Sequence, residues 1–217
     1  CTAVLALARR LGAVAVHANE DYPLNEIRRD AAFAAAAASA GIDFRLHHDA
    51  MLVPAARVLT KTGSPYTVFT PYRQAWYQQL AQDADSAPRA FRAPRRRADD
   101  ATLAAVQAQS TAVVDRLRAL LSVPATVSAH WRGGEQQAQR RLKAFVRDGL
   151  HDYKAQRDLP AVPGTSTLSP YLAAGCLSPR RALASARAAN RGDFAEGSAG
   201  VVSWVSELAW RDFYKQV

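Results

Sequence analysis

The stretch "LNEIRRDAAFAAAAASAG", residues 24–41, decides the first part of the fold. Its alanine-rich body and closing glycine predict a helix. "AVAVH" (13–17) before it and "DFRLHH" (43–48) after it are typical of short strands. "AVLALARRLG" (3–12) predicts a further, amphipathic helix. An order of helix, strand, helix and strand with short connections indicates a parallel sheet covered by helices, which is an α/β fold.

The rest of the chain divides at a charged segment. "DADSAPRAFRAPRRRADD", residues 83–100, is rich in proline and charge, and we interpret its arginine run as a solvated loop rather than a DNA contact. Residues 101–121 are predicted to form a helix of unassigned role. We therefore expect a partial α/β domain at 1–84, an interdomain linker at 85–132 and the first part of a helical domain at 133–217.

Composition points to a polyanionic partner. The 217 residues carry a net charge of +9 and a pI near 10.1, which favours binding to nucleic acid first. The longest apolar run, "AAFAAAAASA" (31–40), is too short and too rich in alanine to span a membrane. The two cysteines, Cys1 and Cys176, lack metal-type spacing and favour no disulfide framework, so we expect a protein of the reducing cytoplasm.

One candidate site lies in "GTSTLSPYLAAGCLSPR", residues 164–180. Its hydroxyl side chains gather at the entrance of a predicted helix, where free backbone N–H groups suit a phosphate. An ordinary Ser/Thr helix cap explains the same pattern. No nucleophile elbow, phosphate-binding glycine loop or zinc motif is present, and no metal site is expected.

A second candidate site lies in the closing helix, "SWVSELAWRDFYKQV" (203–217). Trp204, Glu207, Arg211 and Tyr214 are spaced by three, four and three residues and so share one helix face. A face that mixes aromatic and charged groups suits the wall of a cavity for a flat polar ligand. The alternative is a routine ion pair between Glu207 and Arg211, flanked by core tryptophans.

Four motifs in order resemble the DNA photolyase/cryptochrome family. They are "RRDAAF" (28–33), "TGSPYTVFTPYRQAW" (62–76), "HDYKAQRDLPAVPGTSTLSPYLAAGCLSPR" (151–180) and "WVSELAWRDFY" (204–214), and they are most similar to bacterial members that repair cyclobutane pyrimidine dimers. The resemblance implies a Rossmann-like parallel-sheet amino-terminal domain followed by an all-α FAD-binding domain, both incomplete. Family members are about twice as long, so we expect an internal fragment that is inactive and colourless by itself.

The resemblance also implies a function. We expect light-driven repair of cyclobutane pyrimidine dimers in DNA by electron transfer from reduced FAD, which makes the enzyme a carbon–carbon lyase. The expected partner is DNA that contains pyrimidine dimers, bound by a monomer and without a membrane. A cryptochrome-type blue-light photoreceptor and a (6-4) photolyase are the alternatives within the family, and a generic basic two-domain binding module is the alternative outside it.

Site residues are carried over from the family by their motifs. The catalytic residues are Glu207, which is expected to hydrogen-bond the dimer, and Trp210, which is expected to stack on it; with Arg157 near the phosphates they also bind DNA. The expected FAD-binding residues are Tyr153, Thr165, Ser166, Leu168, Ser169, Trp204 and Arg211.

An antenna chromophore is a further implication of the resemblance. Asn25 and Glu26 match the contact pair of members that bind a folate, methenyltetrahydrofolate, and a deazaflavin is the other antenna that the family allows. Capping at the start of a helix explains the same two residues equally well.

Overall fold

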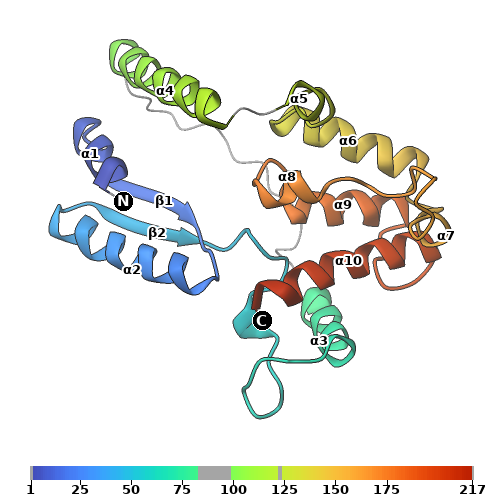
Figure 1. Cartoon of the computed structure of the whole chain (residues 1–217). Coiled ribbons are helices and arrows are strands. Elements are labelled where there is room, and N and C mark those ends of the chain that lie inside the picture. The colour runs from blue at the N-terminus through green and yellow to red at the C-terminus, as the bar shows by residue number, and fades with distance from the viewer. Residues whose placement is uncertain (1, 83–98, 122–123, 217) are drawn as a thin grey trace. The chain divides into compact units, whose positions relative to one another are not determined.

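The structure is a computed structural model of the chain and describes residues 2–82, 99–121 and 124–216 (Figure 1). By their contacts, the described residues divide into two compact units. Unit 1 comprises Cys1–Val16, Ala32–Phe44 and Ala90–Arg132, and unit 2 comprises His17–Ala31, Arg45–Arg89 and Gly133–Val217. The domain boundaries expected at residues 84 and 133 stay a prediction.

The expected alternation of helices and strands is confirmed. The chain begins with α1 (Thr2–Arg10), β1 (Ala15–Asn19), α2 (Leu24–Ser39) and β2 (Asp43–His47). The two strands pair directly and run in the same direction, as Figure 1 shows. β1 begins two residues later than predicted, because regular pairing with β2 starts only after Val14, whose carbonyl accepts the N–H of Asp43 at 3.0 Å.

Unit 1 is built around a small apolar core. α1 contributes Ala8, α2 contributes Phe33 and Ala37, and Ile42 follows from the turn before β2. The ring of Phe33 meets that of Phe44 edge to face, with centroids 4.8 Å apart. Gly41 ends α2 in a left-handed conformation, at a φ of 69°, which a residue with a side chain adopts rarely.

Two helices lie in the segment that was expected to be a linker. α4 (Asp100–Leu121) confirms the helix predicted at 101–121, and α5 (Ala125–His130) follows it. Both belong to unit 1. Most of the predicted linker that the structure describes is therefore helical, and the arginine run at 95–97 lies outside the described residues.

Unit 2 contains the helical part of the chain. Its elements are η1 (Ala55–Arg57), α3 (Phe69–Gln82), α6 (Glu135–Asp148), α7 (Tyr153–Gln156), α8 (Ser169–Ala173), α9 (Pro179–Ala189) and α10 (Ala199–Gln216). After residue 133 the described chain forms helices and loops only, which confirms the expected helical region. None of the described helices combines the length and the apolar composition that a membrane crossing requires.

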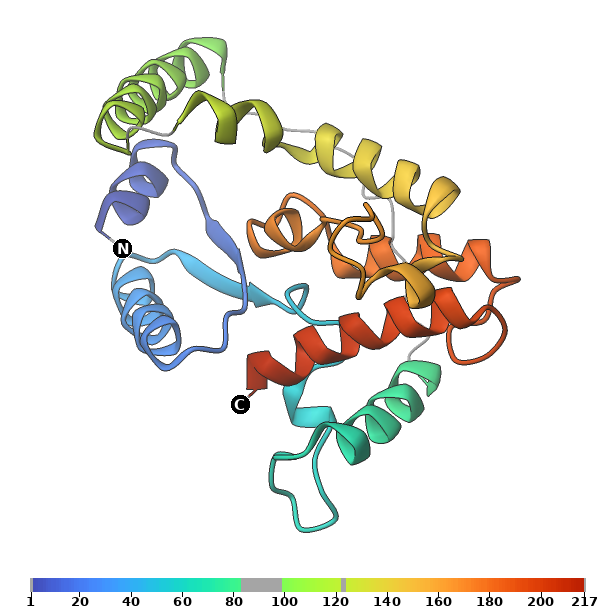
Figure 2. The same ribbon diagram turned by 45° about the vertical axis from the view of Figure 1, so that its right-hand side comes forward.

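α10 is the central helix of unit 2. It contacts α3, α7, α9 and η1, and Figures 1 and 2 both show it between α3 on one side and α9 on the other. Val201, Val205 and Leu208 are spaced by three or four residues and form its buried stripe. Asp212 continues this stripe and is fully buried as well, which makes it the exception on an apolar face.

The start of α10 packs closely on the loop before α7. A Cβ atom at Gly200 would lie 2.1 Å from the carbonyl oxygen of His151 and 2.4 Å from that of Leu150. Both atoms belong to the backbone and cannot rotate away. Only a glycine fits at this position of the helix.

We predict that Gly200→Ala lowers the free energy of unfolding by roughly 2 kcal/mol or more, because the clash outweighs the higher helix propensity of alanine. Gly133→Ala is the matched control, since a Cβ there meets no atom within 4 Å. Denaturant unfolding of the two variants measures the difference. Equal stability of both variants would contradict the close packing of α10 on residues 150–151.

Candidate functional site

One candidate site is a hollow of about 530 Å³ in unit 2, called here the Glu207 pocket. α10 supplies Glu207 and Trp210 to its lining, and Lys154 and Arg157 come from α7 and the residue after it. α3 supplies Phe69 and Arg73. Glu207, Trp210 and Arg157, which the sequence predicted to act together, therefore line one pocket.

Glu207 and Arg157 form an ion pair in this pocket. The Arg157 guanidinium donates to the Glu207 carboxylate and also lies 3.3 Å from Asp158, and each partner of the Glu207 pair keeps about a third of its side chain exposed. The hydrogen bond to Glu207 raises the pKa of Arg157 above its ordinary value. The guanidinium also lies over the ring of Tyr153, 5.5 Å from its centroid. Arg157 therefore orients the carboxylate and balances its charge.

Trp210 is held in an aromatic stack. Its rings lie parallel to the ring of Phe69, at an angle of 10° and a centroid distance of 3.5 Å. Tyr214, one turn further along α10, lies 5.4 Å away at an angle of 20°. Phe69 was not predicted as a site residue, because 141 positions separate it from Trp210 and nothing in either motif shows that they meet.

Two of the predicted flavin contacts are buried in the packing of unit 2. Tyr153 is 7% exposed and Trp204 is 3% exposed. Both pack against Phe145 of α6, with ring centroids at 5.9 Å and 5.4 Å. They lie together around Phe145, and Tyr153 also faces the Arg157 guanidinium.

The predicted phosphate segment, residues 165–169, comprises the loop before α8 and the first residue of that helix, Ser169. Thr165 and Ser169 are exposed and Ser166 is partly exposed, whereas Leu168 is buried. No side chain caps α8, so the ordinary cap that was the alternative explanation is not formed. Arg141 donates to the hydroxyl of Thr167, which places a cation beside these hydroxyl groups. Hydroxyls next to a guanidinium fit a phosphate.

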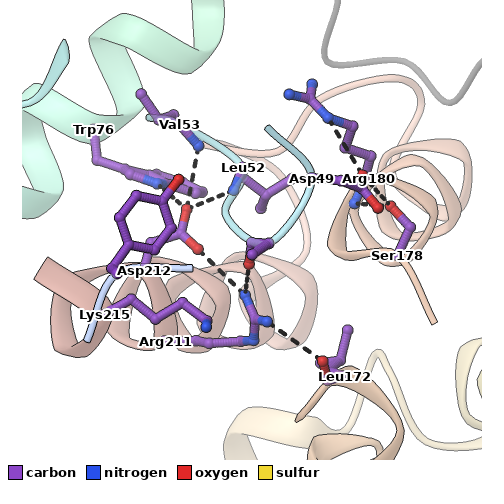
Figure 3. A network of polar contacts seen from close by, with 12 residues as sticks. Asp49, Leu52, Val53, Trp76, Leu172, Ser178, Arg180, Arg211, Asp212 and Lys215 are labelled. Carbon is purple, nitrogen blue, oxygen red and sulfur yellow. Dashed lines mark hydrogen bonds and ion pairs between the residues drawn. The ribbon is translucent and has the colours of Figure 1, made fainter. Parts of the chain in front are cut away.

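Arg211 lines a different hollow of unit 2 from Glu207. Its guanidinium donates to the carbonyl oxygens of Ala50 at 2.5 Å and Leu172 at 3.4 Å (Figure 3). It lines a second hollow, of about 230 Å³, which it shares with Lys215 and Asp49.

The expected single wall on α10 is therefore wrong. Glu207 and Arg211 line different hollows, Trp204 is buried and Tyr214 is 69% exposed. The alternative, an ion pair between Glu207 and Arg211, is also wrong, because each side chain finds its partner on another element. The directions of two side chains four residues apart on an α-helix differ by about 40°. Because of this offset, Glu207 and Arg211 can each contact a different element that packs against α10.

The buried Asp212 joins three segments of unit 2. Its Oδ2 atom accepts the backbone N–H groups of Leu52 at 2.8 Å and Val53 at 3.2 Å, and the indole N–H of Trp76 at 2.9 Å (Figure 3). Its Oδ1 atom faces Arg211 at 3.6 Å. Burial raises the pKa of Asp212 to about 6, although the three hydrogen bonds act in the opposite direction.

Sequence reasoning missed Asp212, but a signal was present. Asp212 follows Leu208 by four residues and so lies on the apolar stripe of its helix. A carboxylate on such a stripe has to find hydrogen-bond donors inside the protein, because its burial is otherwise costly.

The two predicted antenna residues lie in the first turn of α2. Asn25 is exposed and Glu26 is partly exposed. Neither is bonded to another side chain of the described chain, and their antenna role stays a prediction.

The family described as DNA photolyase matches residues 2–91 of the chain. A deoxyribodipyrimidine photo-lyase of Vibrio cholerae is 33% identical over 215 residues, which are 99% of this chain and 43% of the relative. The chain therefore spans less than half the length of this curated relative.

Solved structures show the same likeness. The bacterial class III photolyase of Agrobacterium tumefaciens matches with a TM-score of 0.74 and 26% identity, over 99% of this chain and 42% of that structure. The cryptochrome of Synechocystis sp. PCC6803 matches with a TM-score of 0.69 over 99% of this chain and 43% of that structure. Its identity is 18%, so this second match shows the fold alone.

The raised pKa of Asp212 predicts a pH dependence of stability. The folded protein favours the protonated form of Asp212. The contribution of this group to the free energy of unfolding is therefore fully present below its ordinary pKa of 3.8 and is lost as the pH rises through about 6. Asp212→Asn stays neutral throughout. We therefore expect the free energy of unfolding of the wild type to fall, relative to that of Asp212→Asn, by on the order of 3 kcal/mol between pH 4 and pH 7.

Denaturant unfolding at several pH values measures this difference. Asp115→Asn is the control, because Asp115 is exposed on α4 and its difference from the wild type should stay flat. A constant difference for Asp212→Asn as well would show that the carboxylate is ionised at all these pH values.

Proposed function

The chain belongs to the DNA photolyase/cryptochrome family, and we propose that this protein uses light to split cyclobutane pyrimidine dimers in DNA. One observation carries the proposal: Glu207, Trp210 and Arg157 line the same pocket of about 530 Å³. The pocket offers a carboxylate, an aromatic face and a cation, which are the groups that a dimer and its flanking phosphate need.

The lesion would enter the Glu207 pocket and stack on Trp210. Phe69 and Tyr214 already stack on this indole, so the dimer would use the part of it that lines the pocket. Stacking of a base on an aromatic side chain contributes about 1–3 kcal/mol and does not depend on sequence. Extrusion of the dimer from the duplex is taken from the family, in which photolyases are known as base-flipping enzymes, and not from this geometry.

Glu207 would hydrogen-bond the dimer, and Arg157 would hold it in place. The ion pair orients the carboxylate toward one wall before DNA arrives. Arg157 has further N–H groups, and one of them can bind a phosphate of the lesion strand while the pair persists. The two predicted roles, carboxylate for the dimer and cation for the phosphate, are thus compatible.

Members of this family bind flavin, and we propose FAD as the cofactor. Reduced FAD would supply the electron for the splitting of the dimer when it absorbs blue light. Thr165, Ser166 and Ser169, with the Leu168 backbone and Arg141 nearby, fit its phosphates. Tyr153 and Trp204 would contribute apolar wall, because both are buried around Phe145.

The remaining proposals rest on fewer observations. Arg211 already donates to two carbonyl oxygens, so it would bind FAD with its other N–H groups. A folate or deazaflavin antenna rests on Asn25 and Glu26 alone. We further propose a monomer that acts on dimer-containing DNA in the cytoplasm, and the net charge of +9 supports the DNA partner.

A cryptochrome-type photoreceptor and a (6-4) photolyase are the alternatives. The presence of Glu207 and Trp210 in one pocket favours repair over signalling, because a photoreceptor has no need of a carboxylate and an aromatic face for a lesion. A substrate with a (6-4) photoproduct in place of the cyclobutane dimer tests the second alternative directly.

The experiment uses the protein encoded by the complete reading frame that contains this chain, loaded with FAD and reduced. We expect it to restore the base absorbance of an oligonucleotide with one thymine dimer under blue light and not in darkness. Glu207→Gln should lower the repair yield by roughly tenfold, because a charge-assisted hydrogen bond is lost, and should leave the flavin spectrum unchanged.

Glu135→Gln is the matched control, because Glu135 is exposed at the start of α6, where it accepts a hydrogen bond from Gln139, and it should repair like the wild type. Wild-type protein that binds flavin but restores no absorbance in light would overturn the proposed function. Full repair by Glu207→Gln would overturn the role of Glu207 alone.

A further inference from the structure

α3 supplies a wall of the Glu207 pocket to which no role has been given. Phe69 begins this helix and stacks on Trp210, and Arg73 lies one turn further along. The Arg73 guanidinium lies 5.9 Å from the centroid of the Phe69 ring. Residues four apart share a helix face, so the face that fixes Trp210 also brings a cation to the pocket.

The hollow continues beyond the Glu207 pocket along α3. A second hollow, of about 400 Å³, is lined by Gln74, Tyr77 and Gln78 of this helix. Arg73, Ala195 and Val202 line both hollows, so Arg73 lies where they meet. The two hollows together are called here the α3 groove.

The charge of the α3 groove suits an anion. The 14-residue sequence of α3, "FTPYRQAWYQQLAQ", contains no carboxylate. On the described part of the chain, no acidic side chain pairs with Arg73 or with Lys154 on the facing wall, whereas Arg157 is paired with Glu207. The pocket lining thus carries three cations, Arg73, Lys154 and Arg157, against two carboxylates, Glu196 and Glu207, and its net charge is positive.

The polar groups further along the groove can donate hydrogen bonds. Gln74 and Gln78 have side-chain amides, and the Tyr77 hydroxyl is buried with no hydrogen-bond partner among the described residues. Amide and hydroxyl donors beside a guanidinium are the groups that contact phosphate and sugar oxygens in protein–DNA interfaces. A DNA strand that leaves the Glu207 pocket would meet the exposed amide of Gln74 and then that of Gln78.

We propose that α3 is part of the DNA-binding surface and that Arg73 binds a backbone phosphate next to the extruded lesion. This inference rests on the proposed function, because it is the lesion in the Glu207 pocket that brings the strand to α3. Arg73 contributes affinity and not sequence preference, since a phosphate contact is the same for every base.

The test is the salt dependence of binding in the full-length, FAD-loaded protein. The dissociation constant for an oligonucleotide with one thymine dimer is measured in darkness at several KCl concentrations. Loss of one phosphate contact lowers the slope of log affinity against log salt by about 0.9, and we expect this change in Arg73→Gln together with about tenfold weaker binding at low salt. Arg73→Lys should retain most of the slope.

Two further variants complete the test. Arg181→Gln removes the same charge from an exposed position of α9 that lines neither hollow, and its slope should match the wild type. Gln78→Glu adds a negative charge to the groove at an exposed position and should weaken binding several-fold without removing a contact of the fold. It keeps the inference testable if Arg73→Gln fails to fold.

The outcomes separate this inference from the proposed function. Wild-type protein that repairs the dimer, combined with unchanged slopes in Arg73→Gln and unchanged affinity in Gln78→Glu, would overturn the role of α3 and leave the proposed function intact. Wild-type protein without light-dependent repair would overturn the proposed function itself. Equal weakening by Arg73→Gln and Arg181→Gln would show a general charge effect and would also overturn the assignment to α3.

Discussion

The buried carboxylate of Asp212 is the constraint on which unit 2 depends. One oxygen accepts two backbone N–H groups from the segment at 52–53 and the indole N–H of Trp76. These donors come from two different stretches of chain, so a single residue of α10 fixes both the loop after β2 and α3 against the central helix. An acid buried without these donors would strongly destabilise the fold, which explains why all of them converge on one atom.

This junction also positions the functional groups on either side of it. Because Trp76 is fixed by Asp212, α3 lies where its first residue, Phe69, stacks on Trp210. Because residues 52–53 are fixed as well, the carbonyl of Ala50 comes within reach of Arg211. The polar contacts of Figure 3 and the aromatic stack of the Glu207 pocket are therefore consequences of the same anchoring point.

The sequence predicted well those features that depend on neighbours along the chain. The helices that end at Gly12 and Gly41, the strand before Asp49 and the helical region after residue 133 follow from local patterns, and they are confirmed. The family was also predicted, because each of its motifs is an uninterrupted stretch of sequence. Glu207 and Trp210 could be named together because both lie in the same motif.

The features that were missed depend on partners far along the chain. Asp212 meets Leu52 across 160 positions, and Glu207 meets Arg157 across 50. Helix periodicity placed Glu207 and Arg211 on one face. It could not show that Glu207 would pair with Arg157, or that Arg211 would donate to the carbonyl oxygen of Ala50. The same periodicity, applied to Asp212 on its apolar stripe, would have identified a buried acid but not its donors.

The most direct test is a crystal structure of the full-length protein bound to an oligonucleotide with one thymine dimer. The Glu207 pocket is predicted to hold the dimer outside the duplex, in contact with the ring of Trp210 and within hydrogen-bond distance of Glu207. A dimer that stays in the duplex, or one bound away from this pocket, would contradict the account.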